Sequence, residues 1–162
     1  MCSSDLFPSQ DKVAKDGQQF FDYLKNREEI KNTKIILYGQ SLGTQIATHL
    51  AKENSKDISM LILDGAFTSF TDLACSYKPE AKDVIKKYLA SPYSAKEDIK
   101  LVSVPKILIH SKEDKDIPFA LGKELFETAS EPKNFIEYSG DHIKALIINP
   151  DVIITKVNEN LK

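Results

Sequence analysis

The sequence has few of the features that mark membrane, secreted or nucleic-acid-binding proteins. It contains two cysteines in 162 residues, Cys2 and Cys75, which form neither a metal-binding spacing nor a disulfide framework. No apolar run approaches the roughly 20 residues that a membrane-spanning helix needs. The amino terminus lacks the basic and apolar regions of a signal peptide. We therefore expect reduced thiols and a cytoplasmic protein without a membrane segment.

Charge and composition point in the same direction. The net charge is −2, which gives no reason to expect a nucleic-acid partner or an anionic membrane surface. The composition is 41% hydrophobic and 28% charged, as in an ordinary globular protein. The length suits one domain with a real core, so we assign residues 1–162 to a single domain.

Short apolar runs alternate with amphipathic ones along the chain. The apolar runs are short, and the one at residues 35–38 has no polar alternation, which is typical of strands in a parallel sheet covered on both faces. They predict strands at residues 35–38, 58–63, 106–110 and 133–138. Helical periodicity predicts helices at residues 10–27, 44–52 and 81–89, after Pro118, and from Asn149 to the carboxyl end. The order predicts an α/β fold, a mostly parallel sheet flanked by helices.

Residues 66–100 depart from this rhythm. They hold one amphipathic helix and separate two predicted strands. An insertion on the catalytic side of the sheet would act as a short helical cap. Its aromatic side chains could line an apolar pocket for an acyl group, although each is also a normal core residue: Phe67, Phe70, Tyr77 and, near the end of the segment, Tyr93.

Residues 39–43 read Gly-Gln-Ser-Leu-Gly and stand between a predicted strand and a predicted helix. A G-x-S-x-G pentapeptide in this context is typical of a nucleophile elbow, in which Ser41 occupies a sharp, strained turn. Bulky residues at the two glycine positions would clash with the strand or the helix. The helix amino terminus behind the serine favours developing negative charge. We expect Ser41 to form a covalent intermediate.

A serine nucleophile needs a base, and the chain has three histidines. His49 lies two helical turns beyond Ser41, too far to reach its hydroxyl. His110 ends a predicted strand and is interpreted as structural, bonded to loop backbone. His142 lies in a glycine-containing loop after the last predicted strand, at the sheet edge where α/β proteins place their active sites. His142 is therefore the predicted base.

The acid that orients the base is expected on a loop after a strand. Asp114 fits best, and its neighbours Glu113 and Asp116 could take its place if the loop turns differently. Asp64, after the second predicted strand, is an outside candidate. Asp141 adjoins the base but would point away from it. The sequence alone leaves these carboxylates as alternatives.

The order Ser41, Asp114, His142 resembles that of the α/β-hydrolase superfamily. The chain is most similar to its serine-aminopeptidase-like and acyl-peptidase-like branch, which also contains esterases and depalmitoylases. In that branch the strand before the acid is followed by His-Gly-x-x-Asp-x-x-Val-Pro, and residues 110–118 read His-Ser-Lys-Glu-Asp-Lys-Asp-Ile-Pro. The resemblance therefore implies Asp114 as the acid. Ser111 and Asp141 stand where this branch has glycine.

The resemblance covers only the second half of the family's domain. Residues 1–9 resemble the loop before the helix at residues 10–27, so the sequence is expected to be an amino-terminally truncated hydrolase domain. The missing part would supply one of two oxyanion-hole donors and leave only the backbone N–H of Leu42. The strand at residues 35–38 would then be an open apolar edge, and we expect self-association through it.

These observations predict a serine hydrolase that cleaves carboxylic esters or thioesters through an acyl-enzyme on Ser41. Its partner is a small-molecule acyl substrate, and no metal or organic cofactor is needed. Two alternatives stay open. One is a peptidase of the same branch, and the other is a catalytically impaired α/β-hydrolase-like fragment that serves as a binding or interaction module.

Overall fold

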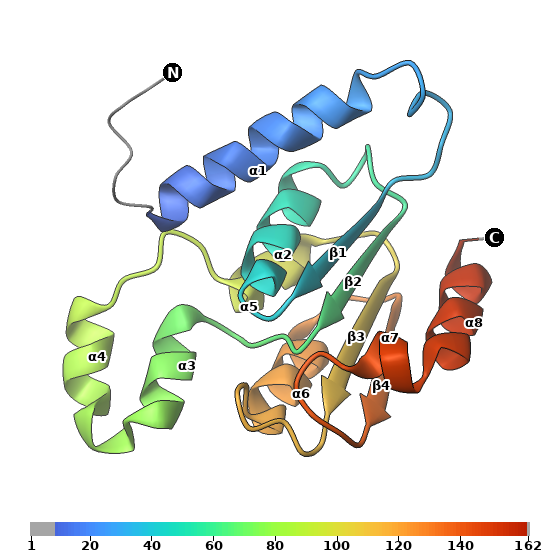
Figure 1. Ribbon diagram of the computed structural model, residues 1–162. Helices are drawn as coiled ribbons and strands as arrows, with labels where there is room; N and C mark the ends of the chain where they lie inside the picture. Colours follow the sequence, from blue (N-terminus) through green and yellow to red (C-terminus); the bar gives the residue numbers. More distant parts are fainter. Residues whose placement is uncertain (1–8, 162) are drawn as a thin grey trace.

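A computed structural model describes residues 9–161, with one parallel sheet at the centre (Figure 1). Its strands lie side by side in chain order: β1 (Ile36–Gln40), β2 (Met60–Asp64), β3 (Lys106–Ser111) and β4 (Lys133–Tyr138). Each strand pairs in parallel with the next. The predicted α/β class is thus confirmed, and the carboxyl ends of all four strands lie at one edge of the sheet.

Helices cover both faces of this sheet (Figure 1). One face carries α2 (Gly43–Glu53), α5 (Ala95–Asp98) with the short 3-10 helix η2 (Ile99–Leu101), and α6 (Phe119–Thr128). On this side α1 (Gln10–Lys25) packs against α2. The other face carries α7 (Ala145–Ile148) and α8 (Pro150–Asn160).

The side chains of neighbouring residues in a strand point to opposite faces of the sheet. In β2, Leu61 and Leu63 enter the core beneath α2, whereas Met60 and Ile62 pack toward α7 and α8. All four are buried. This two-residue alternation between two apolar layers explains why β2 has no polar residue before Asp64.

The element bounds differ from the predicted ones mainly within residues 66–100. The first helix begins after Ser9, whose hydroxyl accepts a hydrogen bond from the Lys12 N–H at 3.3 Å, and it ends at Lys25 instead of residue 27. Residues 1–8, which the sequence likens to a preceding loop, lie outside the described residues. The helix predicted at 81–89 is a 3-10 turn, η1 (Pro79–Ala81), followed by α4 (Lys82–Tyr88).

The structure adds a helix that the sequence did not predict, α3 (Phe70–Tyr77). The Ser69 hydroxyl caps it by accepting a hydrogen bond from the Asp72 N–H at 3.0 Å. Together α3 and α4 stand away from the sheet (Figure 1). Val84 and Tyr88 of α4 remain 59% and 74% exposed, so the pair makes few apolar contacts with the core.

The open edge that the sequence predicts is present in the described part of the chain. Within residues 9–161, β1 pairs with β2 alone. Tyr38 on β1 is 39% exposed, and Leu42 just beyond it is 54% exposed. The backbone on this side offers unpaired donors and acceptors to another strand. Self-association through this edge stays a prediction.

Lys106, the first residue of β3, is a fully buried lysine. Its Nζ donates hydrogen bonds to the carbonyl oxygens of Val102 and Val104, at 2.7 and 2.9 Å. Burial lowers the pKa of this ammonium group to about 8, because taking a charge out of water is costly. The group thus connects the folding stability of the protein to pH.

We expect the Lys106→Met variant to lose part of the pH dependence of stability. The unfolded chain holds its lysine proton up to about pH 10.5, whereas the folded chain releases it near pH 8. Between these values the unfolded state binds more protons, so the contribution of Lys106 to the free energy of unfolding rises with pH. Between pH 7 and pH 10 the rise is about 2–3 kcal/mol.

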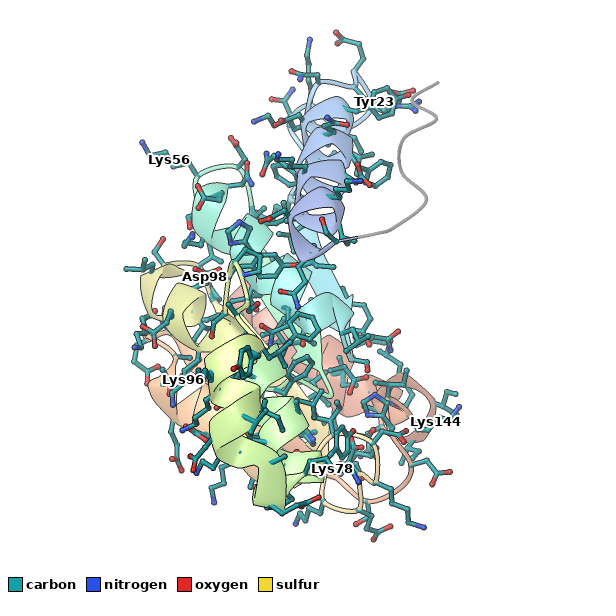
Figure 2. All side chains as sticks on the ribbon, turned by 90° about the vertical axis from the view of Figure 1, so that its left-hand side faces the viewer. Tyr23, Lys56, Lys78, Lys96, Asp98 and Lys144 are labelled. Atoms are coloured by element: carbon teal, nitrogen blue, oxygen red, sulfur yellow. The ribbon has the colours of Figure 1, made fainter. Side chains whose placement is uncertain are left out.

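Urea unfolding of both proteins at pH 7 and pH 10 measures this effect, because the difference between them cancels the other titrating groups. Lys56→Met is the control, since Lys56 is exposed at the surface (Figure 2). Equal pH slopes in wild type and Lys106→Met would contradict the prediction.

Candidate active site

Ser41 lies on the turn between β1 and α2, and its backbone has the strained conformation that the motif predicts. Its φ angle is 50°, in the left-handed region that disfavours residues other than glycine. The Ser41 N–H donates to the Asp64 carbonyl at 2.9 Å, and its own carbonyl accepts from the Thr44 N–H at 3.0 Å. Hydrogen bonds on both sides therefore hold the strained residue in place.

The two glycines of the pentapeptide are not equivalent. A Cβ atom at Gly39 would lie 2.7 Å from the Ala47 Cβ and 2.8 Å from the Gly43 carbonyl oxygen, so no side chain fits there. A Cβ atom at Gly43 would meet nothing within 4 Å in the described structure. The expectation of a clash is correct at the first glycine and wrong at the second, because Gly43 begins α2 on its open side.

Asp114 and His142 are brought together by loops after β3 and β4. The Asp114 Oδ2 and the His142 Nδ1 lie 2.6 Å apart. The other carboxylate oxygen of Asp114 accepts the backbone N–H groups of Asp116 and Ile117, at 2.9 and 2.8 Å. The Asp114 side chain is fully buried and that of His142 is 12% exposed. The acid is therefore fixed, and it orients the imidazole.

The neighbouring carboxylates do not take this place. Glu113, Asp116 and Asp141 are exposed, and none forms a hydrogen bond with His142 among those in residues 9–161. Asp116 contributes its backbone N–H to Asp114 instead. Of the carboxylates that the sequence left open in this loop, the geometry selects Asp114.

The two other histidines have structural surroundings. The His110 ring is buried against Gly122, and its Nε2 lies 3.0 Å from the Ile117 carbonyl oxygen. Burial lowers the pKa of His110. His49 hydrogen-bonds to Asp98 at 2.7 Å and stacks on the ring of Tyr93. Neither ring is placed to activate Ser41.

The His142 ring lies near the Ser41 turn, but no hydrogen bond connects the two side chains within residues 9–161. The ring lies over Gly65, where an added Cβ would be 2.6 Å from the His142 Cε1. Gly65 follows Asp64, whose carbonyl holds the Ser41 N–H. The His142 Nε2 is buried and has no hydrogen-bond partner within residues 9–161. Catalytic hydrogen bonds are often loose in unliganded enzymes and tighten when substrate binds.

A network that the sequence did not reveal lies beside the nucleophile. Asp64 is fully buried, and its Oδ2 accepts a hydrogen bond from the Tyr38 hydroxyl at 3.2 Å. The Gln40 Nε2 donates to the same hydroxyl at 2.9 Å. Burial raises the pKa of Asp64. In the sequence, this network is indicated only by the two-residue alternation of β1, which places Tyr38 and Gln40 on the same side of the strand.

Leu42 follows the nucleophile and stands at the amino end of α2. It is the N-cap residue of that helix, with φ −56° and ψ −31°. Its backbone N–H therefore lies at the positive end of the helix dipole, which favours developing negative charge. This is the position at which one oxyanion-hole donor is predicted.

The charged groups around His142 also raise the question of a metal. Ligand atoms of Asp114, Asp116 and His142 lie within 4.8 Å of one another. The Asp114 oxygens already bind His142 and two backbone N–H groups, so we assign this cluster to the hydrogen-bond network and not to a metal site. That no cofactor takes part stays a prediction.

A cleft of about 440 Å³ opens beside His142. It is lined by Lys115, Asp116, Asp141, Ile143 and Lys144. Lys144 and Lys78 lie at the same end of the molecule, opposite Tyr23 (Figure 2). This end carries the carboxyl ends of the strands, so the cleft opens at the edge of the sheet where the predicted site residues lie.

Solved structures place this architecture among the α/β hydrolases. The Pyrococcus furiosus esterase Pf2001 matches 96% of this chain over 64% of its own, with a TM-score of 0.73 and 16% identity. A serine hydrolase of carbazole degradation, CarC, matches 99% of this chain over 74% of its own, with a TM-score of 0.68 and 16% identity. At this identity the likeness shows the fold.

The family model described as serine aminopeptidase, S33, matches residues 5–91. The chain belongs to this family of the α/β-hydrolase superfamily, which confirms the resemblance seen in the sequence. Arabidopsis thaliana WAV2, an α/β-hydrolase domain-containing protein, is 28% identical over 93% of this chain and 54% of its own length. Lysophosphatidylserine lipase ABHD12 of Xenopus tropicalis is 28% identical over 81% of this chain and 37% of its own.

The chain thus spans about half the length, or less, of these curated relatives. Separately, none of the helices formed by residues 9–161 has the length and apolar character needed to cross a bilayer.

Proposed function

We propose that this chain carries the nucleophile, base and acid of a serine hydrolase that cleaves carboxylic esters or thioesters. The observation that carries the proposal is the 2.6 Å hydrogen bond between His142 and the buried, backbone-held Asp114, beside a strained serine on a strand-to-helix turn. A histidine oriented in this way is suited to accept a proton from a nearby hydroxyl.

In the proposed reaction, the Ser41 Oγ attacks the acyl carbonyl while the His142 Nε2 takes the hydroxyl proton. Asp114 holds the imidazole in the tautomer that leaves Nε2 free and stabilises the imidazolium that forms. The Leu42 N–H stabilises the oxyanion. His142 returns the proton to the departing alcohol or thiol, and a water molecule then releases the acyl group from Ser41.

An ester or thioester fits better than a peptide. One relative is named as a lysophosphatidylserine lipase and one structural neighbour as an esterase, whereas the family model is named for an aminopeptidase. No described segment forms a peptide-binding domain around the site. Phe67 does not line the proposed acyl pocket, because it is fully buried in a cluster with Leu73 and Ile117.

The cytoplasmic location proposed here rests on the expectation of reduced thiols.

A fluorophosphonate probe tests the proposal directly. We expect covalent labelling of Ser41, located by peptide mass spectrometry, and no labelling of Ser41→Ala. Ser76→Ala removes a serine whose hydroxyl donates to the Leu73 carbonyl oxygen at 2.7 Å, and this variant should label like wild type. Hydrolysis of p-nitrophenyl butyrate but not of an aminoacyl p-nitroanilide would identify an esterase, and the reverse a peptidase.

Two outcomes would count against a hydrolase. Labelling that persists in Ser41→Ala would place the reactive group elsewhere. Wild-type protein that is folded, yet neither labelled nor active, would favour the alternative of a catalytically impaired binding module.

A further inference from the structure

Besides Asp114, a second buried carboxylate, that of Asp64, lies near His142. It ends β2, the strand next to the nucleophile turn. The residue after it, Gly65, lies against the His142 ring, where an added Cβ would be 2.6 Å from Cε1 and 3.0 Å from Nδ1. The backbone carbonyl of Asp64 holds the Ser41 N–H at 2.9 Å. One residue therefore adjoins both the proposed nucleophile and the proposed base.

The carboxylate of Asp64 is held by a chain of hydrogen bonds from β1. The Gln40 Nε2 donates to the Tyr38 oxygen, which leaves the hydroxyl hydrogen of Tyr38 to point at the Asp64 Oδ2. Burial and the nearby carboxylate raise the pKa of Tyr38, so the hydroxyl remains a donor. Donation to a carboxylate favours its ionised form.

The other carboxylate oxygen has no such partner. The Asp64 Oδ1 is buried and makes no hydrogen bond within the described structure. A buried polar atom left without a partner is costly and calls for a reason. The His142 Nε2 is also buried and unpartnered in the described structure, and the charges of His142 and Asp64 act on each other. An orphaned acceptor near the group that gains a positive charge during catalysis has an electrostatic use.

Several charged groups act on His142 and on Asp64. Asp114 from the β3–α6 loop binds His142 directly, Asp116 lies within 4.8 Å of it, and His110 interacts with it at longer range. Burial has the largest effect on Asp64 and raises its pKa. Hydrogen bonding by Tyr38 and Gln40 lowers this pKa, and so does the charge of His142. The charge of Asp114 raises it. The charges of His142 and Asp64 thus attract.

We propose that Asp64 is a positioning residue for His142, and this inference rests on the proposed hydrolase function. The Gln40–Tyr38–Asp64 chain holds a negative charge beside the imidazole, in addition to the charge of Asp114. When Ser41 transfers its proton to the His142 Nε2, this second charge stabilises the imidazolium. Asp64 touches neither substrate nor proton; it acts through His142. The assignment gives a role to Gln40 of the pentapeptide and to Tyr38 before it.

The test is the pH profile of kcat/KM for p-nitrophenyl butyrate in Asp64→Asn, a change that keeps the shape of the side chain. We expect the plateau to fall about tenfold. The midpoint of the acid limb should move to lower pH by about 0.5–1 unit, because a removed negative charge makes His142 bind its proton less tightly. A purely structural defect would lower the plateau without moving the midpoint.

Two further variants serve as a weaker change in the same network and as a charge-matched control. Tyr38→Phe keeps the carboxylate but removes its donor, so the midpoint should move in the same direction by a smaller amount. Asp57→Asn removes the same charge near the opposite end of β2, where Asp57 pairs with Lys25 at the surface, and should match wild type. An Asp64→Asn midpoint within about 0.1 unit of wild type would overturn the proposal, whether or not the plateau falls.

A measurement that needs no activity separates this inference from the proposed function. In a Ser41→Ala background, NMR follows the titration of the three histidine rings, with His49 and His110 as internal references. We expect a lower midpoint for His142 alone when Asp64→Asn is added, or Tyr38→Phe if Asp64→Asn does not fold. An unchanged His142 titration overturns the role of Asp64. Absence of fluorophosphonate labelling in wild type overturns the hydrolase proposal instead.

Discussion

Replacement of Asp114 by asparagine is expected to lower kcat for p-nitrophenyl butyrate by about 10⁴-fold. The His142 Nδ1 lies 2.6 Å from the Asp114 Oδ2, and an amide nitrogen at that place would donate to Nδ1. The imidazole would then carry its hydrogen on Nε2, where it could not accept the Ser41 proton. The carboxylate that stabilises the imidazolium would also be lost.

The matched control is Glu113→Gln. Glu113 is the adjacent acid and is exposed, so its neutralisation should leave kcat within about twofold of wild type. Circular dichroism and urea unfolding would confirm that both variants fold, and steady-state kinetics from pH 6 to pH 9 would give kcat. Equal losses in the two variants would show that the loop as a whole, and not the Asp114 carboxylate, supports the activity.

Gly39→Ala is expected to destabilise the protein by about 3 kcal/mol. The added methyl group would lie 2.7 Å from the Ala47 Cβ, 2.8 Å from the Gly43 carbonyl oxygen and 3.0 Å from the Thr44 Cα. Two of these atoms are backbone atoms of the turn and of α2, so no side-chain rotation relieves the overlap. The helix must move away from β1, and the Ser41 turn must deform with it.

Gly43→Ala serves as the comparison, because the two glycines belong to the same pentapeptide. Its new Cβ meets nothing within 4 Å in the described structure, and alanine favours the helix that begins there. We expect its free energy of unfolding to stay within about 1 kcal/mol of wild type. Urea unfolding of the two variants measures both values, and similar losses in both would contradict the steric argument.

The sequence predicts the sheet better than it predicts residues 66–100. The central strands β2 and β3 combine an apolar run with burial at every position, so their local pattern and their tertiary environment agree. The helix α3 was missed because only Leu73 among its residues is buried. The helix is also only 8 residues long, about two turns, which is too short for a repeat of apolar positions to stand out from the surrounding sequence. The Ser69 cap, with Asp72 three residues later, was the signal that could have located it.

At the site, motif and order along the chain predicted Ser41, and loop position predicted His142 and the group of acids around Asp114. Only the structure shows which of these acids hydrogen-bonds to His142, since the choice depends on how the loop after β3 turns back on itself. The network of Gln40, Tyr38 and Asp64 could not be read from sequence. Its members come from two neighbouring strands, and their contact depends on the register of β1 and β2.

The strained backbone of Ser41 has a consequence for how such a sequence evolves. A residue other than glycine at φ 50° costs the fold about 1 kcal/mol or more, and glycine would occupy this turn without that cost. Selection for stability alone would therefore replace the serine. Under the proposed function, selection for the hydroxyl opposes this replacement, and a lineage that no longer needs the chemistry would be free to drift toward glycine at this position.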